Sequence, residues 1–334
     1  MQFEFTEETT IAEWLHHWLV RYKIPTIKET TRDDYITTID QHIIPALGSY
    51  TVSDISTDVI QEFFNEQYES GNLQTGGPLS NKSIVNMKNI LSSAMQKAVD
   101  LDFISKNPVN AVELKRVINP DITVLERCDE KALIEKLEKD RFSGKYDFAI
   151  YLGLKLGLRN GEVAALQWND IDFSGKIIHI RRRVKRVKNL NAAPNEPHTI
   201  LQIAPPKSKQ SARDIPFSGD FEKTLRSYFE HNTVSGKRKS AYIFLSNTGD
   251  VADPTTINNY FKRRLKELSI PTNDIHFHCL RHTFATRAIE KNVDIKTLST
   301  LLGHSSVQFT LDRYAHVLTD QKRRTMELIL NDDT

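Results

Sequence analysis

Apolar residues in the first hundred positions of the chain recur with the three-to-four spacing of α-helices. The pattern covers four stretches, at 11–22, 35–43, 57–68 and 84–98. Thr9 or Thr10 can cap the first stretch and Ser80 the last, because hydroxyl side chains accept hydrogen bonds from the free amides of a first helical turn. Four helices of this size can close one core. This region is therefore predicted to be a small helical domain with its aromatic residues inside.

The second part of the chain mixes helical and strand patterns. Helical spacing is found at 129–140 and 145–156, and through most of the chain after Asp220. Apolar and basic residues alternate in 176–188, which is typical of a strand. Further strands are expected at 199–203, 212–217 and 241–245. The predicted fold class is α+β, mainly helical, with a small antiparallel sheet in the second part.

The boundary between the two parts follows Asn107-Pro108, which ends the last front helix. The stretch after it has no clear period and includes Pro120. We predict a helical domain at 1–113, a linker at 114–126, a second domain at 127–318 and a tail helix at 319–334. The tail carries apolar residues, and two alternatives are open for it: packing on its own domain or docking on a neighbouring subunit.

Composition narrows the class of protein. Hydrophobic residues make up 39% of the chain and charged residues 26%, as in ordinary folded proteins. No apolar run reaches the roughly eighteen residues of a membrane span. The first ten residues lack the order of a secretory signal. Cys128 and Cys279 are too few for a disulfide framework or a closed thiolate metal site. These features predict a cytoplasmic protein with no membrane partner.

Charge is divided unevenly along the chain. Residues 1–118 contain 10 Lys and Arg against 16 Asp and Glu, whereas the remaining residues contain 35 against 27. The basic excess therefore belongs to the second part, and it favours a polyanionic partner. Lys and Arg also solubilise protein surfaces, so the asymmetry alone does not establish one.

Candidate chemistry begins at Gly157-Leu158-Arg159-Asn160-Gly161-Glu162. The flanking glycines allow a tight turn that presents Arg159 at a helix start. A guanidinium there can hold a phosphate through two parallel hydrogen bonds, which a lysine cannot do. The alternative is a glycine that ends a helix and is followed by a surface arginine. Glu162 is expected to anchor this turn.

A second motif is His276-Phe277-His278-Cys279-Leu280-Arg281-His282-Thr283. His278 and Arg281 are three residues apart and so share one face of a helix, where they can bind phosphate and transfer a proton. A zinc site is the competing interpretation of these histidines and Cys279. The spacing fits no common zinc pattern, and the adjacent arginine would repel a cation.

Two further segments, Leu302-Gly303-His304-Ser305 and Asp312-Arg313-Tyr314-Ala315, carry little information individually. A histidine at a helix end usually complements the helix dipole, and most tyrosines are half-buried packing residues. Their order after the first two motifs changes the interpretation. Glycine-flanked Arg, His-x-x-Arg, Gly-His and then Tyr form one ordered series.

This ordered series resembles the signature of the tyrosine recombinases, or lambda-type integrases, such as those of phages and conjugative transposons. The resemblance covers roughly residues 125–320. It implies a mixed α/β catalytic domain, preceded by a four-helix, SAM-like domain that binds the core DNA site. It also implies a site-specific recombinase that cuts and rejoins DNA without metal, cofactor or external energy source.

The resemblance assigns a role to each candidate residue. Tyr314 would attack the phosphodiester, giving a 3′-phosphotyrosine and a free 5′-hydroxyl, and Arg159, Arg281 and His304 would stabilise the added negative charge. The phenol has an ordinary pKa of about 10, so it needs a base, and His278 is expected to be that base. Lys207, on a β-hairpin, would protonate the leaving oxygen, with Lys209 as the alternative.

Further basic residues are candidates for contact with DNA phosphates. Six lie in the 176–188 stretch and its end, and two on the last front helix: Arg181, Arg182, Arg183, Lys185, Arg186, Lys188, Lys82 and Lys88. The alternative for the first six is a solvated edge strand that charge protects from aggregation.

The expected partner is double-stranded DNA with inverted-repeat core sites, bound by a homotetramer on paired sites. Free in solution, the protein would be a monomer or weak oligomer associated with the bacterial nucleoid. Accessory excision or DNA-bending proteins are further candidate partners. Integration and excision of a mobile element is the expected task. The alternatives are chromosome-dimer resolution, a type IB topoisomerase and a non-catalytic DNA-binding regulator.

Overall fold

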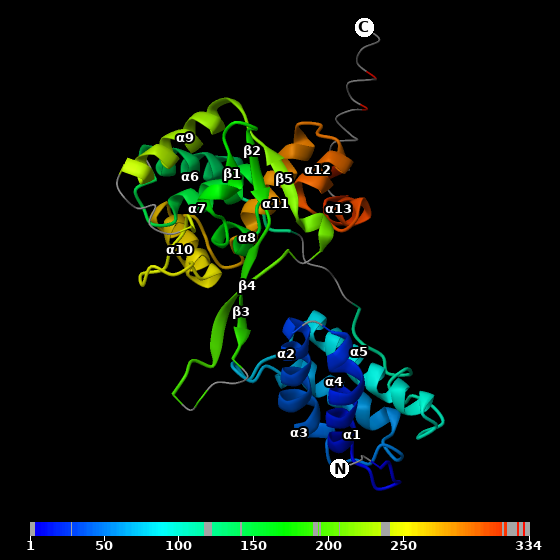
Figure 1. Ribbon diagram of the computed structural model, residues 1–334. Coiled ribbons are helices and arrows are strands. Elements are labelled where there is room, and N and C mark those ends of the chain that lie inside the picture. Colours follow the sequence, from blue (N-terminus) through cyan, green and yellow to red (C-terminus); the bar gives the residue numbers. More distant parts are fainter. Residues whose placement is uncertain are drawn as a thin grey trace. The chain divides into compact units, whose positions relative to one another are not determined.

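The computed structural model describes residues 4–27, 29–116, 122–140, 142–189, 193, 195–206, 208–234, 241–315, 317–318, 326 and 330. The chain divides into two compact units, Met1–Pro120 and Asp121–Thr334 (Figure 1). Each unit is described by itself. Within the described residues, no helix combines the length and the apolar character needed to cross a bilayer.

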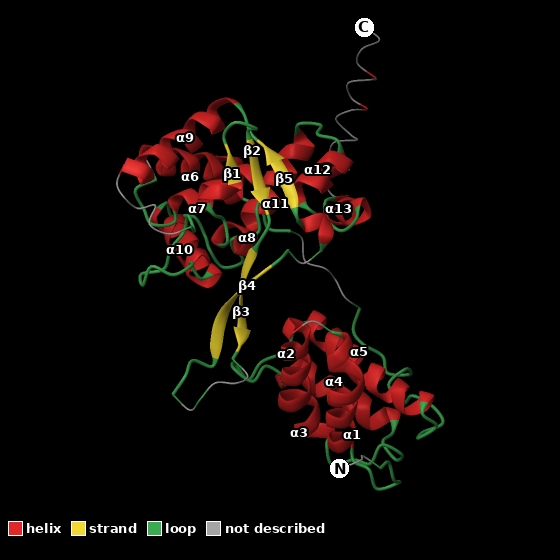
Figure 2. Cartoon of the chain, in the orientation of Figure 1, coloured by secondary structure: helices red, strands yellow, loops and turns green. Residues whose placement is uncertain are grey.

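The first unit is built from helices (Figure 2). They are α1 (Ile11–Trp18), α2 (Glu29–Thr38), α3 (Ile44–Leu47), α4 (Thr57–Ser70) and α5 (Asn81–Asp100). Short π-helical turns at Leu19–Lys23 and Ile39–Ile43 extend α1 and join α2 to α3. Thr10 and Ser80 cap α1 and α5, as their hydroxyl groups predicted.

The core of the first unit consists of the apolar stripes of these helices. Trp14 and Trp18 are buried, and the Trp14 indole Nε1 donates to the Ala94 carbonyl at 3.1 Å. Phe63 and Phe64 from α4 complete the interior. The tryptophans of α1 and the phenylalanines of α4 are therefore core residues, as expected, whereas Tyr50 is 42% exposed.

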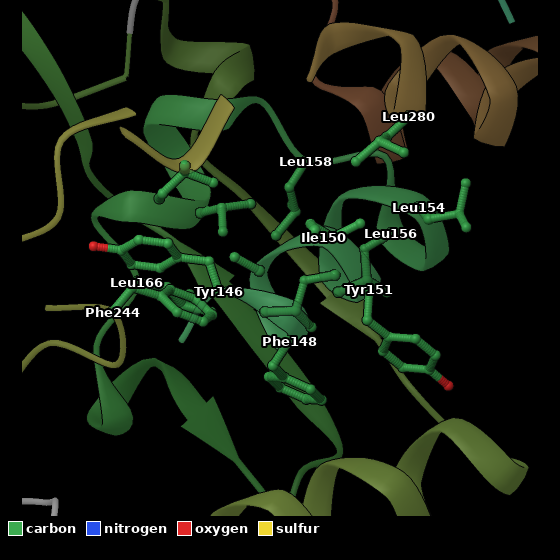
Figure 3. Packing of buried hydrophobic residues seen from close by; sticks show 14 of the residues in the cluster. Tyr146, Phe148, Ile150, Tyr151, Leu154, Leu156, Leu158, Leu166, Phe244 and Leu280 are labelled. Carbon is green, nitrogen blue, oxygen red and sulfur yellow. The ribbon is translucent and has the colours of Figure 1, made fainter. Parts of the chain in front are cut away.

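Helix α7 (Asp147–Leu156) lies in the core of the second unit and is buried at every residue except Lys155 (Figure 3). The helices that contact it are α6 (Arg127–Lys139), α8 (Asn160–Ala164), α10 (Pro254–Glu267) and α11 (His278–Glu290). The unit also contains α9 (Gly219–Val234), α12 (Ile295–Leu302) and α13 (Val307–Arg313). Leu280 of α11 joins the α7 core, while the opposite part of α11 packs against α12 and Tyr314.

The strands form two separate antiparallel sheets. β1 (Ile171–Asp172), β2 (Ile177–Ile180) and β5 (Arg213–Pro216) pair in the order β1-β2-β5, with Ile178 opposite Ile215. β3 (Arg183–Lys188) and β4 (Thr199–Ala204) form a two-stranded ribbon. The predicted mainly helical fold with small antiparallel sheets is confirmed.

Two strand predictions were wrong in detail. The stretch 176–188 is two strands, because the chain leaves β5 after Ile180 and pairs with β4 from Arg183 onward. Residues 241–245 are not a strand, since only isolated bridges join Tyr242 to Gln167 and Leu245 to Val251. Ile243 and Phe244 are nevertheless buried, because they belong to the hydrophobic core of the second unit.

Candidate active site

The C-terminal end of α7 positions the first arginine. Gly157 ends the helix with a φ of +63°, and a Cβ there would lie 2.6 Å from the Phe284 ring, so only glycine fits. Two residues later, Arg159 is the N-cap of α8, and its backbone N–H donates to Glu162 Oε2 at 3.0 Å. The Arg159 guanidinium donates to Glu162 Oε1 at 2.7 Å and remains 34% exposed.

Glu162 also binds a second arginine, which the sequence analysis did not single out. Arg213 of β5 donates through both terminal nitrogens to the Glu162 carboxylate, at 3.1 and 3.0 Å. Both side chains are nearly inaccessible to water. Burial alone would raise the pKa of Glu162, but Arg213 and Arg159 outweigh it and hold the pKa below its ordinary value. Glu162 is thus a buried carboxylate shared by two arginines.

The last carbonyls of α12 hold three arginines together. Arg213 Nε donates to Leu301 O at 2.5 Å, Arg281 to Leu302 O at 2.6 Å and Arg159 to Gly303 O at 2.9 Å. These carbonyls lack partners inside the helix and form the negative end of its dipole. Gly303 makes the turn with a φ of +64°, in the left-handed region. A helix terminus therefore fixes three cations from α8, β5 and α11.

Arg281 is the most buried of the three arginines. Its side chain is among the largest fully buried ones, and its other terminal nitrogen donates to the Gly157 carbonyl at 2.8 Å. Burial and the charge of Arg159 lower its pKa to about 9, which leaves the guanidinium charged at neutral pH. The Gly157 and Leu302 oxygens that accept from it are neutral carbonyls, so these contacts do not cancel its positive charge.

Tyr314 follows α13 and lies beside the same face of α11. It is 1% exposed, and its hydroxyl is hydrogen bonded to Nδ1 of His282 at 2.9 Å. Burial raises the pKa of Tyr314 to about 12. Burial also lowers the pKa of His282 to about 3, with added effects of His278, Arg313 and Arg281. At neutral pH the pair is a neutral phenol and a neutral imidazole.

His278 lies one helical turn before His282. Their rings meet edge to face with centroids 4.7 Å apart, and His278 is exposed to solvent. Part of the ring is nevertheless enclosed by protein, and this loss of hydration is the main cause that lowers the pKa of His278 to about 4. The charges of Arg281 and Arg159 add to the effect. His278 is the base that the sequence predicts for Tyr314, but the histidine hydrogen bonded to that hydroxyl is His282.

His304 follows the αL residue Gly303 at the end of α12. Its Nδ1 is hydrogen bonded to the hydroxyl of Thr310, a buried residue of α13, at 2.8 Å. Burial and the charges of Arg281 and Arg159 lower its pKa to about 3, so the ring is neutral near pH 7. Arg159, Arg281, His304 and Tyr314, which are widely separated in the sequence, are thereby connected through one continuous set of contacts.

A family model described as the phage integrase family matches residues 123–321, and one for the N-terminal SAM-like domain of phage integrases matches residues 10–67. The first match covers more than half of the chain. The chain belongs to the phage integrase family. The resemblance inferred from the sequence motifs is confirmed.

Named relatives of this integrase-family chain come from bacteria and mobile elements. A XerC-like tyrosine recombinase of Caldanaerobacter subterraneus is 28% identical, covering 98% of this chain and 84% of that protein. The transposase from transposon Tn916 of Enterococcus faecalis is 27% identical over 74% of this chain, and the match spans only 61% of its length. The ICEBs1 integrase of Bacillus subtilis is 26% identical, over 85% of this chain and 73% of that protein.

Solved structures of the family share the fold. The Tn1549 transposon integrase in complex with transposon right end DNA has a TM-score of 0.77 at 23% identity, covering 96% of this chain and all of that one. A lambda integrase tetramer bound to a Holliday junction has a TM-score of 0.64 at 19% identity, covering 91% of this chain and 77% of that one. Both likenesses extend across the helical and the mixed unit.

Several residues predicted for DNA contact in this integrase have partners within the protein. Arg181 donates to Asp214 at 2.6 Å, Arg182 to both oxygens of Asp170 at 2.6 and 2.7 Å, and Arg186 to Asp253 at 2.5 Å. These ion pairs attach the β2–β3 segment to surrounding elements. Each arginine therefore lies against a carboxylate.

The remaining predicted DNA contacts differ among themselves. The buried Nε of Arg183 has no hydrogen-bond partner among the described residues, and Lys185 is half-buried. Lys88 Nζ donates to the Val112 carbonyl at 2.6 Å, whereas Lys82 is exposed on the first turn of α5. The side chain of Lys188 lies outside what the structure describes.

Two predictions concern residues that the structure does not place. Lys207, the expected general acid, lies outside the described residues, and so does the side chain of its alternative, Lys209. The predicted tail helix also lies largely outside them. Only Met326 and Leu330 of the tail are described, with 50% and 67% exposure.

Arg213 and His282 are the site residues that the sequence analysis missed. Arg213 is separated from Glu162 by 51 positions, so no local pattern connects the two. His282 could have been singled out, because it lies four residues after His278 on the same face of one helix. Within the described residues, no cluster of three His, Cys, Asp or Glu forms a metal site, and the competing zinc interpretation gains no support.

Proposed function

We propose that the protein is a site-specific DNA recombinase that uses Tyr314 as its nucleophile. Attack of the phenol oxygen on a phosphodiester would give a 3′-phosphotyrosine and release a 5′-hydroxyl, which later attacks in the reverse direction to rejoin a strand. The observation that carries the proposal is the buried Tyr314 hydroxyl beside a cluster of three arginines, of which Arg159 and Arg213 share the Glu162 carboxylate and Arg281 binds neutral carbonyls. A cluster with this excess of positive charge suits a reacting phosphodiester.

The arginines supply the electrostatic part of the reaction. The transition state concentrates negative charge on the non-bridging oxygens, and fixed cations in a place of low polarity stabilise that charge most strongly. Arg159 keeps 34% of its side chain exposed, which leaves it able to meet a phosphate, while Arg281 is held rigidly behind it by Gly157 and Leu302. We assign His278 and His304 as additional hydrogen-bond donors to the phosphate.

Proton transfer completes the chemistry. A phenol with a pKa near 12 is protonated at neutral pH, so its proton must leave as the bond to phosphorus forms. The departing 5′-oxygen needs a proton in turn. Lys207 remains our candidate for that acid, with Lys209 as the alternative, because the resemblance to tyrosine recombinases implies a lysine in this segment.

The partners follow from the same proposal. We propose double-stranded DNA with inverted-repeat core sites as the substrate, bound by four copies of the chain on paired sites. Solved relatives with this fold include a transposon integrase with DNA and a lambda integrase tetramer on a Holliday junction. Accessory excision or DNA-bending proteins, and association with the nucleoid, remain part of the proposal.

Integration and excision of a mobile element is the task that we favour. Named relatives with this assignment include a Tn916 transposase and the ICEBs1 integrase. A second candidate is chromosome-dimer resolution, because the XerC-like recombinase matches 98% of this chain. Footprinting of the protein on DNA distinguishes the two tasks. Specific footprints on DNA that flanks its gene support the mobile-element task, and footprints elsewhere support resolution.

The decisive experiment traps the covalent intermediate on DNA that flanks the gene and carries a nick near the cleavage point. The short fragment released by cleavage diffuses away, so the adduct accumulates. A 5′ label on the cut strand should remain with the protein, whereas a 3′ label should leave with the free 5′-hydroxyl fragment. Tyr314→Phe should form no adduct. An adduct in that variant, or retention of the 3′ label, would falsify the proposed nucleophile and polarity.

A further inference from the structure

His282 carries the clearest unassigned feature of the site. It is a buried titratable group, 8% exposed, whose Nδ1 lies 2.9 Å from the Tyr314 hydroxyl. Tyr314 itself is 1% exposed, so bulk water has almost no access to its hydroxyl. The phenol proton must nevertheless depart during cleavage, and a proton moves directly only between atoms in hydrogen-bond contact.

We propose that His282 is the proton acceptor for Tyr314 in strand cleavage and the proton donor to the same oxygen in strand rejoining. This inference rests on the proposed function, since it presupposes Tyr314 as the nucleophile. In cleavage, the Tyr314 oxygen bonds to phosphorus, the bond from phosphorus to the 5′-oxygen breaks, and the phenol proton passes to Nδ1 of His282. A separate acid protonates the 5′-oxygen. Rejoining reverses each transfer, so no outside reactant is consumed.

The protonation state of the imidazole agrees with this role. Burial, His278, Arg313 and Arg281 lower the pKa of His282, so the ring is neutral and Nδ1 can accept when the ring proton is on Nε2. A bound phosphodiester brings a negative charge that partly offsets the effect of Arg281 on the pKa of His282. The phosphate therefore makes His282 a better base when the substrate is present, and the acidity of the phenol rises as its oxygen bonds to phosphorus.

Helix geometry explains how α11 can place one histidine beside Tyr314 and another where the substrate can reach it. His278, Arg281 and His282 are spaced three and four residues apart on α11, so all three project from one face. Arg281 is fixed by the carbonyls of Gly157 and Leu302, which fixes the rotation of that face. His282 is then directed at Tyr314, while His278 is exposed and open to the substrate.

The test replaces His282 by asparagine in the full chain and measures single-turnover adduct formation on the nicked DNA. Asparagine can accept the Tyr314 hydrogen bond but is not a base, so a purely structural histidine would be replaced without loss. We expect a decrease of about 10²- to 10⁴-fold, the usual effect of removing a general base. Thermal unfolding of the variant verifies that it is folded, and His282→Gln serves as the second variant.

A substrate with sulfur in place of the 5′-bridging oxygen identifies which proton is affected. A thiolate leaves without protonation, so the loss of a general acid is rescued by sulfur, whereas the loss of the base for Tyr314 is not. We expect His282→Asn to stay slow on both substrates. Rescue by sulfur, a rate near that of the wild type, or a faster rate due to release of Tyr314 from a restraining contact would each overturn the proposal.

His278→Asn is the matched comparison, because it changes the neighbouring histidine and keeps the His282 contact. If only His278→Asn is slow on the sulfur substrate, the proton passes to His278 and the inference about His282 is overturned. Failure of the proposed function looks different. In that case the wild-type protein forms no adduct on either substrate, or Tyr314→Phe still forms one.

Discussion

Two arginine-rich regions of the molecule differ in what their guanidinium groups bind. In the site, Arg159 and Arg213 share one carboxylate, Glu162, whereas Arg281 donates to the backbone carbonyls of Gly157 and Leu302. In the β2–β3 segment, three arginines have a carboxylate each: Arg181 with Asp214, Arg182 with Asp170 and Arg186 with Asp253. Carbonyl acceptors orient an arginine and leave its charge in place, whereas carboxylates cancel it. The density of arginine in a sequence therefore does not measure the charge offered to a ligand.

The largest expected effect comes from removing the Glu162 carboxylate, which Arg159 and Arg213 share. Glu162→Gln keeps the shape of the side chain but leaves the half-buried Arg159 and the buried Arg213 without the anion that they share. We expect the free energy of unfolding to fall by about 3–5 kcal/mol, as for other broken buried ion pairs. Asp214→Asn, at an exposed pair, should cost no more than about 1 kcal/mol. Urea unfolding of both variants measures the difference, and equal losses would contradict the comparison.

The pH dependence of unfolding gives a second measurement on the same variant. The pKa of Glu162 is lowered in the folded state, so its contribution is complete above the ordinary carboxyl range and is lost as pH falls through the folded pKa. The gap in unfolding free energy between wild type and Glu162→Gln should therefore narrow in acid. A gap that widened as pH fell would show that the carboxylate is not held in its charged form.

The next largest effect is on the rate of strand cleavage and follows from the position of the Arg281 guanidinium. Arg281→Lys retains a positive charge but cannot reach the Gly157 and Leu302 carbonyls with two separate nitrogens, so the cation is misplaced. We expect adduct formation to slow by about 10²- to 10³-fold, similar to the loss of one transition-state donor. Arg226→Lys, at the partly exposed pair with Glu222 on α9, is the matched control and should cleave like the wild type. Equal rates in the two variants would remove Arg281 from the mechanism.

The smallest effect tests the β2–β3 arginines. Asp253→Asn removes the carboxylate that binds Arg186 yet keeps a side chain able to cap α10. The freed arginine should add one phosphate contact, which steepens the slope of log affinity against log salt by about 0.9 on duplex DNA. Binding titrations at several salt concentrations measure the slope. An unchanged slope would show that Arg186 does not reach DNA even when it is unpaired.

Local patterns in the sequence predicted the fold well, because helix periods and caps are set by near neighbours. Ser80 capping α5 and the apolar α7 are examples. The strand predicted at 241–245 was wrong because a strand depends on a pairing partner, which local sequence does not specify. The apolar residues of this stretch indicated burial and nothing more. The break between β2 and β3 likewise depends on β4 and β5, which follow later in the chain.

Resemblance to a family found the ordered site residues, but it did not supply their contacts. Arg213 reaches Glu162 only because β5 pairs with β2 and lies against α12, which no residue spacing reveals. The partners of Arg182 and Arg186 are 12 and 67 positions away, so their pairing was equally hidden. His282 was visible as a histidine on the correct helix face, and its contact with Tyr314 became evident only once α13 was in place.

The grip of the α12 terminus on three arginines has a consequence for how this site tolerates sequence change. Its acceptors at Leu301, Leu302 and Gly303 are main-chain oxygens, so exchanging the Leu301 side chain deletes none of them. Substitutions of side chains there leave the carbonyl oxygens in place opposite the arginines. Inserting or deleting one residue turns a helix by about 100° and moves every acceptor at once. The number of residues in this segment is consequently under stricter constraint than their identity.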